Sequence, residues 1–312
     1  LSSALADDWP QWFGPEHDGV WRETGIIDKF PDGGPKVLWR TPVNRGYAGP
    51  SVAGDRVFLM DRKALDTQEA KAKGARTGEK QGNERLLCLN AVTGKVIWEK
   101  AYDCPYTMSY SAGPRVTPLV DGDRVYTFGG EGNLICRATE DGSKKWAHDF
   151  KELFGVKTQT WGFAASPLVH GNLLICLASG DGTTAVAFNK VSGKEVWRSL
   201  TAKQPGYCPP CIVKHKGRDL LLIWHPEAIN ALDPLNGKIY WRVPWKIRYG
   251  LTITTPQMID DDHLFLSSFY NGSTLLKLKE DESTPDIVYR TERASERKTT
   301  HLHGIMNTPV LR

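Results

Sequence analysis

Four times in this chain a short apolar run ends in a glycine-centred turn, and a tryptophan follows four residues after the glycine. The tryptophans are Trp98, Trp146, Trp197 and Trp241, and the glycines are Gly94, Gly142, Gly193 and Gly237. Successive tryptophans lie roughly 50 residues apart, a period typical of repeat arrays with one supersecondary unit per repeat. Short strands within such a unit predict a β-propeller.

A proline opens an apolar run at the start of each period. The six positions are Pro50, Pro118, Pro167, Pro210, Pro256 and Pro309. Proline lacks an N–H and is tolerated at the first residue of a strand, so we expect it to mark the first strand of each unit. The Gly-Asp and Gly-Asn turns that follow suit the positive φ of hairpins. The sequence therefore predicts four-stranded antiparallel sheets repeated radially as blades.

Five complete repeats are present, and the fifth departs from the pattern because Tyr289 replaces its tryptophan. Val37–Arg40 reads as a lone fourth strand before the repeats, and Pro309 opens a lone first strand after them. A ring closes by pairing strands from its two ends, which removes the exposed sheet edge. Parts of such a closing blade are missing here. We therefore expect a propeller truncated at its C-terminus, from a ring of roughly seven or eight blades.

Residues 1–35 are expected to form a signal remnant and lead-in segment, and residues 36–312 the incomplete propeller. Leu1–Ala6 resembles the end of a secretory signal peptide, because small residues precede two acidic ones. We predict an exported protein that is periplasmic or associated with the cell envelope. Residues 62–85 are rich in Lys, Arg, Gly and Ala and interrupt the first repeat, which predicts a mobile, solvated insertion.

Charge and hydropathy argue against nucleic-acid binding and against a transmembrane segment. The 40 basic and 36 acidic residues leave a net charge of +4, and the basic residues are scattered along the chain. This pattern does not predict a nucleic-acid footprint. No window reaches the roughly 18 consecutive apolar residues of a transmembrane helix. We expect neither nucleic-acid binding nor a transmembrane segment.

One face of the propeller is the candidate binding face. The tips between second and third strands and the connectors between blades emerge together, and the connectors are long, as at 101–117 and 147–166. Long connections on a rigid scaffold are where binding groups collect, although aromatic side chains there can also fill the mouth of the channel. The candidate ligand-binding residues on this face are Tyr47, Tyr106, Arg115, Trp161, Phe163, Tyr207, Arg248, Tyr249, His301 and His303.

Metal ligands and reactive thiols are less well defined. Glu131, Asp181 and Glu227 lie at or near tips on the same face and are candidates for binding a hard cation. The motif formed by Cys208 and Cys211 is compatible with a redox pair, half a zinc site or a structural role that includes a local disulfide. We favour the structural role, because Pro210 opens a strand and the chain has no second such motif. Three further cysteines read as small buried hydrophobes: Cys88, Cys136 and Cys176.

Segments 90–98 and 231–241 resemble the tryptophan-docking motif of the PQQ-like β-propeller repeat superfamily. Residues 9–15, with Gly46 and Tyr47, are similar to exported PQQ-like repeat proteins of planctomycete and verrucomicrobial bacteria. The resemblance covers nearly the whole chain and implies the propeller fold. It leaves the activity open, because the superfamily includes quinoprotein dehydrogenases and the outer-membrane assembly lipoprotein BamB.

The resemblance to quinoprotein dehydrogenases implies pyrroloquinoline quinone held over calcium, with a disulfide between adjacent cysteines covering the cofactor. This chain has no adjacent cysteine pair, and no calcium triad can be matched to particular positions. We therefore predict a non-catalytic exported propeller, without a cofactor, that binds a protein partner or ligand through the long-connector face. Two alternatives stay open: a PQQ- and calcium-dependent alcohol or sugar dehydrogenase, and a carbohydrate-binding propeller.

Overall fold

The computed structural model describes residues 7–25, 27–72, 80–291, 295, 297–299 and 301–310. The signal-peptide prediction rests on residues 1–6, which lie outside this part. The chain divides into two compact units, residues 1–149 with 158–163 and residues 150–157 with 164–312. The described helices are short, and none is long and apolar enough to cross a membrane.

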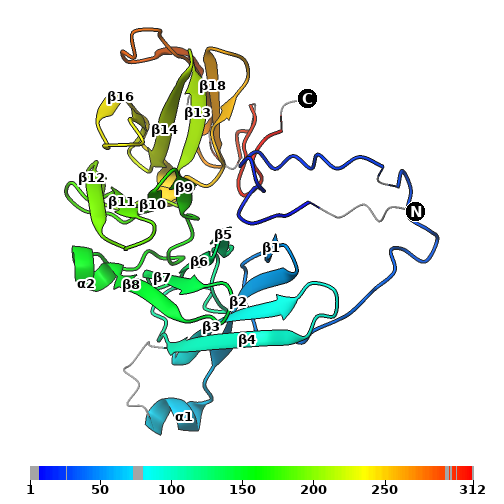
Figure 1. Ribbon diagram of the computed structural model, residues 1–312. Helices are drawn as coiled ribbons and strands as arrows, with labels where there is room; N and C mark the ends of the chain where they lie inside the picture. The colour runs from blue at the N-terminus through cyan, green and yellow to red at the C-terminus, as the bar shows by residue number, and fades with distance from the viewer. Residues whose placement is uncertain are drawn as a thin grey trace. The chain divides into compact units, whose positions relative to one another are not determined.

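The first unit holds two four-stranded antiparallel sheets, each in chain order (Figure 1). The first sheet consists of β1 (Ser51–Ala53), β2 (Arg56–Ala64), β3 (Gly82–Asn90) and β4 (Val96–Asp103). The second consists of β5 (Leu119–Asp121), β6 (Arg124–Phe128), β7 (Asn133–Ala138) and β8 (Lys144–Asp149). The short helix α1 (Thr67–Ala72) lies beyond the end of the β2–β3 hairpin.

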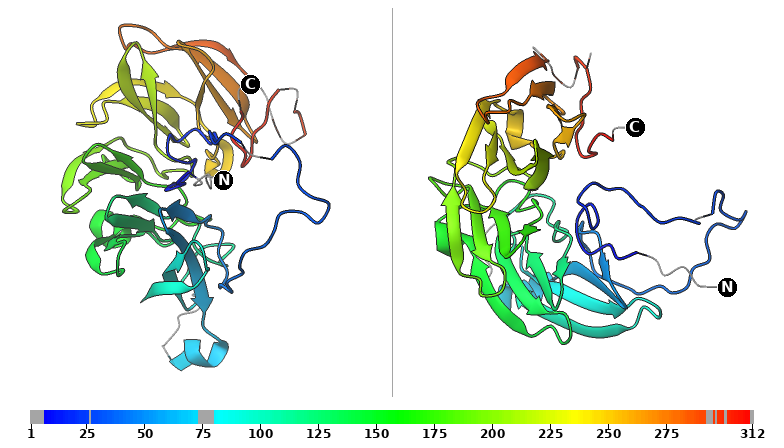
Figure 2. Two further views of the ribbon diagram at one scale, coloured as in Figure 1. Left: turned by 45° about the vertical axis from the view of Figure 1, so that its right-hand side comes forward. Right: turned by 45° about the horizontal axis from the view of Figure 1, so that its top comes forward.

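The second unit holds three such sheets, coloured green, yellow and orange in turn in Figure 2. The first consists of β9 (Leu168–His170), β10 (Leu173–Leu177), β11 (Ala185–Asn189) and β12 (Glu195–Ser199). The second consists of β13 (Cys211–His215), β14 (Arg218–His225), β15 (Ala228–Leu232) and β16 (Ile239–Pro244). The third consists of β17 (Gln257–Met258), β18 (His263–Ser268), β19 (Gly272–Lys277) and β20 (Asp286–Arg290). Helix α2 (Phe150–Phe154) and the 3-10 turn η1 (Arg248–Gly250) lie in connectors.

The five sheets confirm the predicted repeats, and the fold is an all-β propeller built of four-stranded blades. A proline directly precedes the first strand of every blade, as predicted. Each repeat tryptophan lies on the fourth strand, and the ladder register shifts directly after its pair, which locally increases the twist. The pairs are Cys88↔Trp98, Cys136↔Trp146, Ala187↔Trp197, Ala231↔Trp241 and, in the fifth blade, Leu275↔Tyr289.

Three tryptophans also donate a hydrogen bond from the indole to the turn of the following repeat. Within the first unit the Trp98 indole N–H donates to the Thr139 carbonyl at 3.0 Å. A Cβ on the turn residue Gly142 would lie 2.8 Å from that indole, and its φ of 70° is in the left-handed region. Glycine is therefore required twice, for its backbone conformation and for the approach of the ring. The same hydrogen bond joins Trp39 to Ala91 at 2.8 Å and Trp197 to Pro234 at 3.1 Å.

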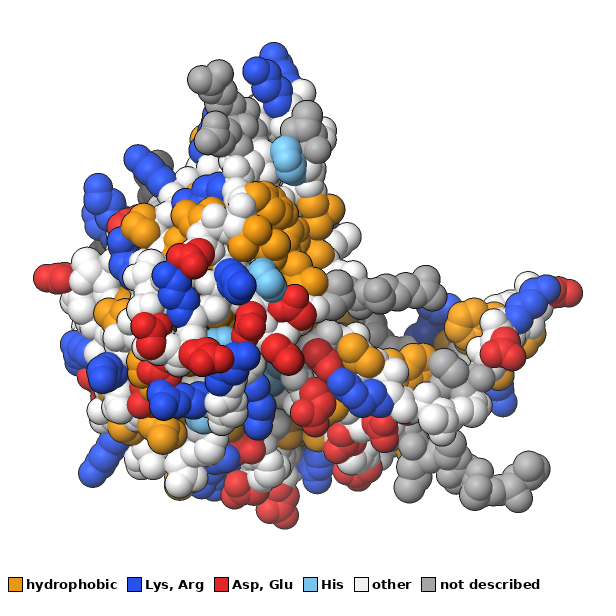
Figure 3. Space-filling model, turned by 90° about the horizontal axis from the view of Figure 1, so that it is seen from above, with side chains coloured by type: hydrophobic (Ala, Val, Ile, Leu, Met, Phe, Trp, Pro, Cys, Tyr) orange, Lys and Arg blue, Asp and Glu red, His pale blue; other side chains and the backbone are white. Residues whose placement is uncertain are grey.

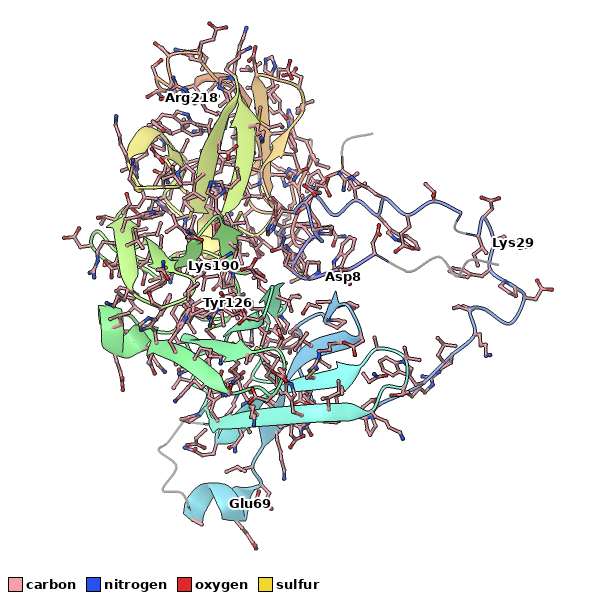
Figure 4. All side chains as sticks on the ribbon, viewed as in Figure 1. Asp8, Lys29, Glu69, Tyr126, Lys190 and Arg218 are labelled. Atoms are coloured by element: carbon pink, nitrogen blue, oxygen red, sulfur yellow. The ribbon has the colours of Figure 1, made fainter. Side chains whose placement is uncertain are left out.

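The lead-in segment pairs with the first strands of both blades of its unit. Trp9 and Val52 exchange two backbone hydrogen bonds of 2.9 Å. The Pro10 carbonyl accepts from the Val120 N–H at 2.8 Å. The Asp8 carboxylate accepts from the Gly54 N–H at 2.7 Å (Figure 4). These bonds occupy backbone groups at the edges of β1 and β5 that would otherwise face solvent.

Three predicted boundaries differ from the structure. Val37–Arg40 forms no strand, and Leu38 there is 75% exposed. Residues 307–310 around Pro309 likewise form no strand, so neither lone strand is present in the described chain. The insertion at 62–85 is shorter than predicted, because β2 and β3 pair as far as Ala64↔Gly82. Its residues 73–79 lie outside the described part. The total of roughly seven or eight blades stays a prediction.

Candidate functional site

A cleft of about 1100 Å³ opens at the connector end of the first blade. We call it the first-blade cleft. Segment 43–47, the end of the β2–β3 hairpin and residues 110–112 form its walls. Polar and aromatic side chains line it, among them Arg45, Tyr47, Arg62, Lys63, Lys80 and Tyr110. Helix α1, marked by Glu69 in Figure 4, follows one wall in the sequence.

Backbone pairing and one arginine hold the rim of the cleft. The Arg62 N–H donates to the Arg45 carbonyl at 2.8 Å, so segment 43–47 runs beside β2. The Arg115 guanidinium donates to the carbonyls of Gly113, Ser109 and Tyr110 at 2.6, 2.9 and 2.7 Å. It also lies 5.2 Å from the centroid of the Tyr47 ring. The structure thus brings the predicted residues Tyr47 and Arg115 together, with Arg115 as the anchor of the rim.

A buried carboxylate, that of Glu84, holds residues next to the first-blade cleft in place. Glu84 is fully buried and accepts hydrogen bonds from the hydroxyls of Tyr102 and Tyr106. It also accepts from the Gly130 N–H at 2.9 Å. Burial raises the pKa of Glu84 above its ordinary value, and these hydrogen bonds and the Arg62 charge act against that rise. Arg62 lies 4.1 Å from the Tyr106 ring centroid.

The sequence predicted that Tyr106 presents a binding surface, but its side chain is fully buried and is not among the residues that line the cleft. Burial and the Glu84 carboxylate raise the pKa of its hydroxyl far above the ordinary range. Phe163 is also buried, at 1% exposure, with its ring 5.2 Å from that of Phe128. Trp161 is half-buried. The aromatic side chains predicted for this connector thus divide between packing and surface.

A second carboxylate fixes the wall of the cleft. Asp61 is 1% exposed and receives two hydrogen bonds from the Arg85 guanidinium, at 2.8 and 2.7 Å. The Asn44 N–H donates to the same carboxylate at 2.6 Å, which fastens segment 43–47 to β2. Hydrogen bonding to Asp61 raises the pKa of Arg85. Paired in this way, both charges are held in one geometry.

The carboxylates predicted as metal candidates are engaged by hydrogen bonds. Glu131 is 2% exposed and accepts from the Thr107 N–H at 2.7 Å and the Thr158 hydroxyl at 2.5 Å. The Asp181 carboxylate accepts from a threonine hydroxyl at 2.8 Å, and the Glu227 carboxylate accepts from a backbone N–H at 3.1 Å. No three His, Cys, Asp or Glu side chains of the described residues gather as a metal site requires.

In the second unit the fourth-blade connector and the fifth-blade tip meet in an aromatic group, here called the Tyr249 cluster: Arg248, Tyr249, Phe269 and Tyr270. The Arg248 guanidinium lies 5.5 Å from each tyrosine ring centroid. The two tyrosine rings meet edge to face at 5.0 Å, and Phe269 lies 4.9 Å from Tyr270. The Asn271 side chain accepts from the Arg248 N–H at 3.0 Å, which joins tip and connector. Sequence analysis missed Phe269 and Tyr270, although an aromatic pair directly before Asn-Gly at a tip could have identified them.

Tyr207, His301 and His303 of this unit each contact a different neighbour, and His301 is exposed. Tyr207 is buried, at 8% exposure, and its N–H donates to the Thr252 carbonyl at 2.9 Å. His301 stacks on Tyr289 with ring centroids 6.3 Å apart. The His303 Nδ1 lies 2.6 Å from the Phe269 carbonyl, which assigns it as the donor. The two histidines thus have different partners.

The cysteines are all buried free thiols. Burial raises the pKa of Cys211 to about 12 and that of Cys208 well above its ordinary value. A thiol that resists ionisation is a poor nucleophile and a poor metal ligand. These environments agree with the structural role predicted for the pair, and with the burial predicted for Cys88, Cys136 and Cys176.

Comparison with known proteins gives a consistent relationship. The profile of a family described as outer membrane protein assembly factor BamB matches residues 82–296, more than half of the chain. A curated relative with that description, from Alkalilimnicola ehrlichii, is 25% identical over 241 residues, which cover 76% of this chain and 52% of the relative. This chain thus spans about half the length of that relative.

The solved structure of one similar protein shows the same fold. BamB from Moraxella catarrhalis aligns with a TM-score of 0.52 at 15% identity, covering 80% of this chain and 65% of that protein. A quinohemoprotein alcohol dehydrogenase from Pseudomonas putida HK5 aligns with a TM-score of 0.48 at 16% identity, covering 81% of this chain and 43% of that enzyme.

Proposed function

Because the chain belongs to the family of the outer membrane protein assembly factor BamB, we propose that it is an exported, non-catalytic propeller of the cell envelope. In this proposal it holds a protein partner on the connector face of its blades. The name of the matched relatives supports a role in the assembly of outer membrane proteins. The contacts of Trp98 and Trp197 serve as the tryptophan docking that keeps neighbouring blades in place.

The observation that carries this proposal is a pair of exposed tyrosines in a strained backbone conformation. Tyr110 and Tyr249 lie in the connectors that follow the first and fourth blades, and they are 70% and 62% exposed. Both have positive φ, 51° and 57°, a region that non-glycine residues seldom adopt. Strain of this kind persists where the surrounding structure imposes it, and it gathers at functional sites.

An arginine accompanies each of these tyrosines. Arg115 donates to the Tyr110 carbonyl at 2.7 Å, and Arg248 lies 5.5 Å from the Tyr249 ring. Tyrosine and arginine dominate the residues that contribute most to protein–protein binding. A ring already held in place loses little conformational entropy when a partner covers it. The two connectors therefore present exposed aromatic side chains, with the backbone of Tyr110 and the ring of Tyr249 held by neighbouring groups.

Three buried carboxylates near the first-blade cleft, which are not among its lining residues, support binding rather than catalysis. Glu84, Asp61 and Glu131 are nearly or fully buried, and each accepts hydrogen bonds from neighbouring groups of the protein. A general acid or base must reach a substrate proton. These carboxylates instead fasten the connector and the rim, so their role is to shape the surface.

Site-specific photo-crosslinking in the cells that make the protein tests the proposal. A photoreactive amino acid at Tyr110 and, in a separate variant, at Tyr249 should each capture an envelope protein, identified by mass spectrometry. Matched controls are Val92 and Leu235, which are 74% and 64% exposed in turns at the opposite ends of their blades. Equal capture from the control positions, or no capture from the tyrosines, would contradict the proposal.

A substitution separates binding from folding at the same position. Tyr110→Gly should leave the free energy of unfolding within about 1 kcal/mol of the parent, because glycine accepts positive φ without strain. The same variant should lose binding of the captured partner. If it binds the partner as well as the parent does, Tyr110 is not an anchor.

A further inference from the structure

We propose that the first-blade cleft binds an acidic segment of the partner protein, and that the cleft contacts the carboxylates of that segment. The inference rests on the proposed function and adds the chemistry of what is bound. Three exposed cations carry it: Arg45 on the rim, Lys63 on β2 and Lys80 before β3. None of the three takes part in an ion pair with another described residue.

Backbone pairing fixes the positions of these cations. The Arg45 carbonyl accepts from the Arg62 N–H at 2.8 Å. Lys63 is paired with Asn83 in the β2–β3 ladder. Lys80 and Tyr106 exchange two backbone hydrogen bonds of 2.9 Å, and the Tyr106 hydroxyl donates to the buried Glu84. The three charges thus project from an ordered frame rather than from a free loop.

The carboxylate in the lining of the cleft, that of Asp66, already accepts hydrogen bonds. The Asp66 carboxylate accepts from the N–H groups of Gln68 and Glu69 at 2.8 and 2.9 Å, at the start of α1. Arg62, also in the lining, faces the buried Glu84. Among the described residues that line the cleft, three exposed cations and one carboxylate, that of Asp66, leave a positive surplus. On the face seen in Figure 3, by contrast, acidic and basic side chains lie beside one another.

Size and rim chemistry favour a peptide segment. The volume of about 1100 Å³ slightly exceeds that of small-molecule pockets, which are typically about 300–1,000 Å³. Tyr47 and Tyr110 flank the cations and are 53% and 70% exposed, so apolar parts of a bound chain would have rings to pack on. A segment that alternates acidic and apolar side chains matches both features.

Fluorescence anisotropy with purified protein tests this inference. The probe is a labelled ten-residue peptide rich in Asp and Glu with interspersed Leu, and its control carries Asn and Gln in place of the acids. We expect the acidic peptide to bind at least about tenfold more tightly, and its affinity to fall as salt is raised from about 0.05 to 0.2 M. Equal binding of the two peptides would overturn the inference.

A matched pair of variants locates the site. The triple change Arg45→Gln, Lys63→Gln and Lys80→Gln should weaken binding of the acidic peptide by about tenfold or more. The control changes Lys95, Lys144 and Lys145, exposed at the turn ends of the same unit, to glutamine. It alters net charge equally and should change affinity by less than about twofold. Circular dichroism checks that both fold. If the control loses as much affinity as the cleft variant, the cleft is not the site.

A third ligand class distinguishes peptide carboxylates from phosphates. A single-stranded DNA oligonucleotide of the same charge as the peptide should bind more weakly, and tighter binding of the DNA would contradict the inference. If the acidic peptide does not bind but crosslinking at Tyr110 persists, only the inference of an acidic segment is wrong. If crosslinking at Tyr110 fails, the proposed function itself is wrong.

Discussion

The connector after the first blade and the connector after the fourth blade occupy equivalent positions, yet different physics holds them. Behind the first lie buried carboxylates, with Glu84 and Glu131 accepting hydrogen bonds from the connector itself. Behind the second, Trp224 and Trp245 stack at 5.5 Å with an angle of 8° between the rings. Both tryptophans are buried, and the Arg290 guanidinium lies 5.3 Å from the Trp245 ring.

The difference teaches what each kind of support provides. A buried charge loses its hydration and repays this only when all its partners are in place, so it fixes particular atoms at the expense of stability. A stacked aromatic pair buries a large apolar area and contributes stability with fewer directional demands. We therefore expect the polar support to define geometry, and the apolar support to carry more of the free energy of unfolding.

The largest expected effect is on the apolar side. Trp224→Ala removes a side chain that is 1% exposed, and should lower the free energy of unfolding by about 4 kcal/mol. Urea unfolding followed by circular dichroism measures it. Val191→Ala, at a 51% exposed turn position in the same unit, is the control and should change stability by less than about 0.5 kcal/mol. A loss below about 1 kcal/mol in the tryptophan variant would contradict the contrast.

His225 gives the apolar side a pH response of its own. It is fully buried, and burial lowers its pKa from 6.5 to about 4. The unfolded chain therefore takes up the proton first, so this contribution to stability is complete above about pH 6.5 and is lost as the pH falls toward 4. We expect a loss of up to about 3 kcal/mol across that range. His225→Gln should flatten the profile, and an unchanged slope would show that another group is responsible.

Glu84 should respond in the opposite direction and by a smaller amount. Its pKa is raised, so the folded state favours the protonated form; this contribution is present at low pH and is lost as the pH rises through the raised pKa. Glu84→Gln removes the ionisation, at an expected cost of about 1 kcal/mol at low pH. The stability difference between parent and variant should shrink as pH rises, measured by urea unfolding at several pH values. A difference that grows with pH would mean that the fold favours the carboxylate.

The smallest effect concerns the turns, where the two units are alike. Asn90 and Asn189 each accept hydrogen bonds from two N–H groups of their turn, at 3.1 and 2.9 Å in both cases. Asn90→Ala and Asn189→Ala should therefore each lower stability by about 0.5–1 kcal/mol, and by similar amounts. Thermal unfolding compares them. Unequal losses would show that the contrast between the units extends beyond the connector ends.

The fold could be predicted from the sequence because its determinants are local and repeated. A proline before each first strand, a glycine-centred turn and a tryptophan four residues after the glycine leave few alternatives. The same local signals failed outside the repeats. Val37–Arg40 has the residues of a fourth strand but no third strand beside it, and Trp39 alone keeps its expected contact with Ala91.

The site was predicted less well because its contacts join residues that are distant in the sequence. Residues 62–85 looked solvated, but Arg62 and Glu84 face each other inside the blade. Tyr106 looked exposed, but its backbone pairs with Lys80 and its hydroxyl reaches Glu84. Composition shows which groups are polar. It does not show which polar groups bury one another.

The lead-in segment also constrains the order in which this protein can be made. Residues 8–10 are synthesised before either blade, yet their hydrogen-bond partners Val52 and Val120 belong to β1 and β5. Closing such long loops costs chain entropy, and contacts between distant residues tend to form late. The first part of the described chain to leave the ribosome is thus expected to dock after the strands that receive it. Until then, the edge strands of two newly formed sheets stay unpaired and can associate with other chains. A chaperone that covers these edges would be needed most at this stage.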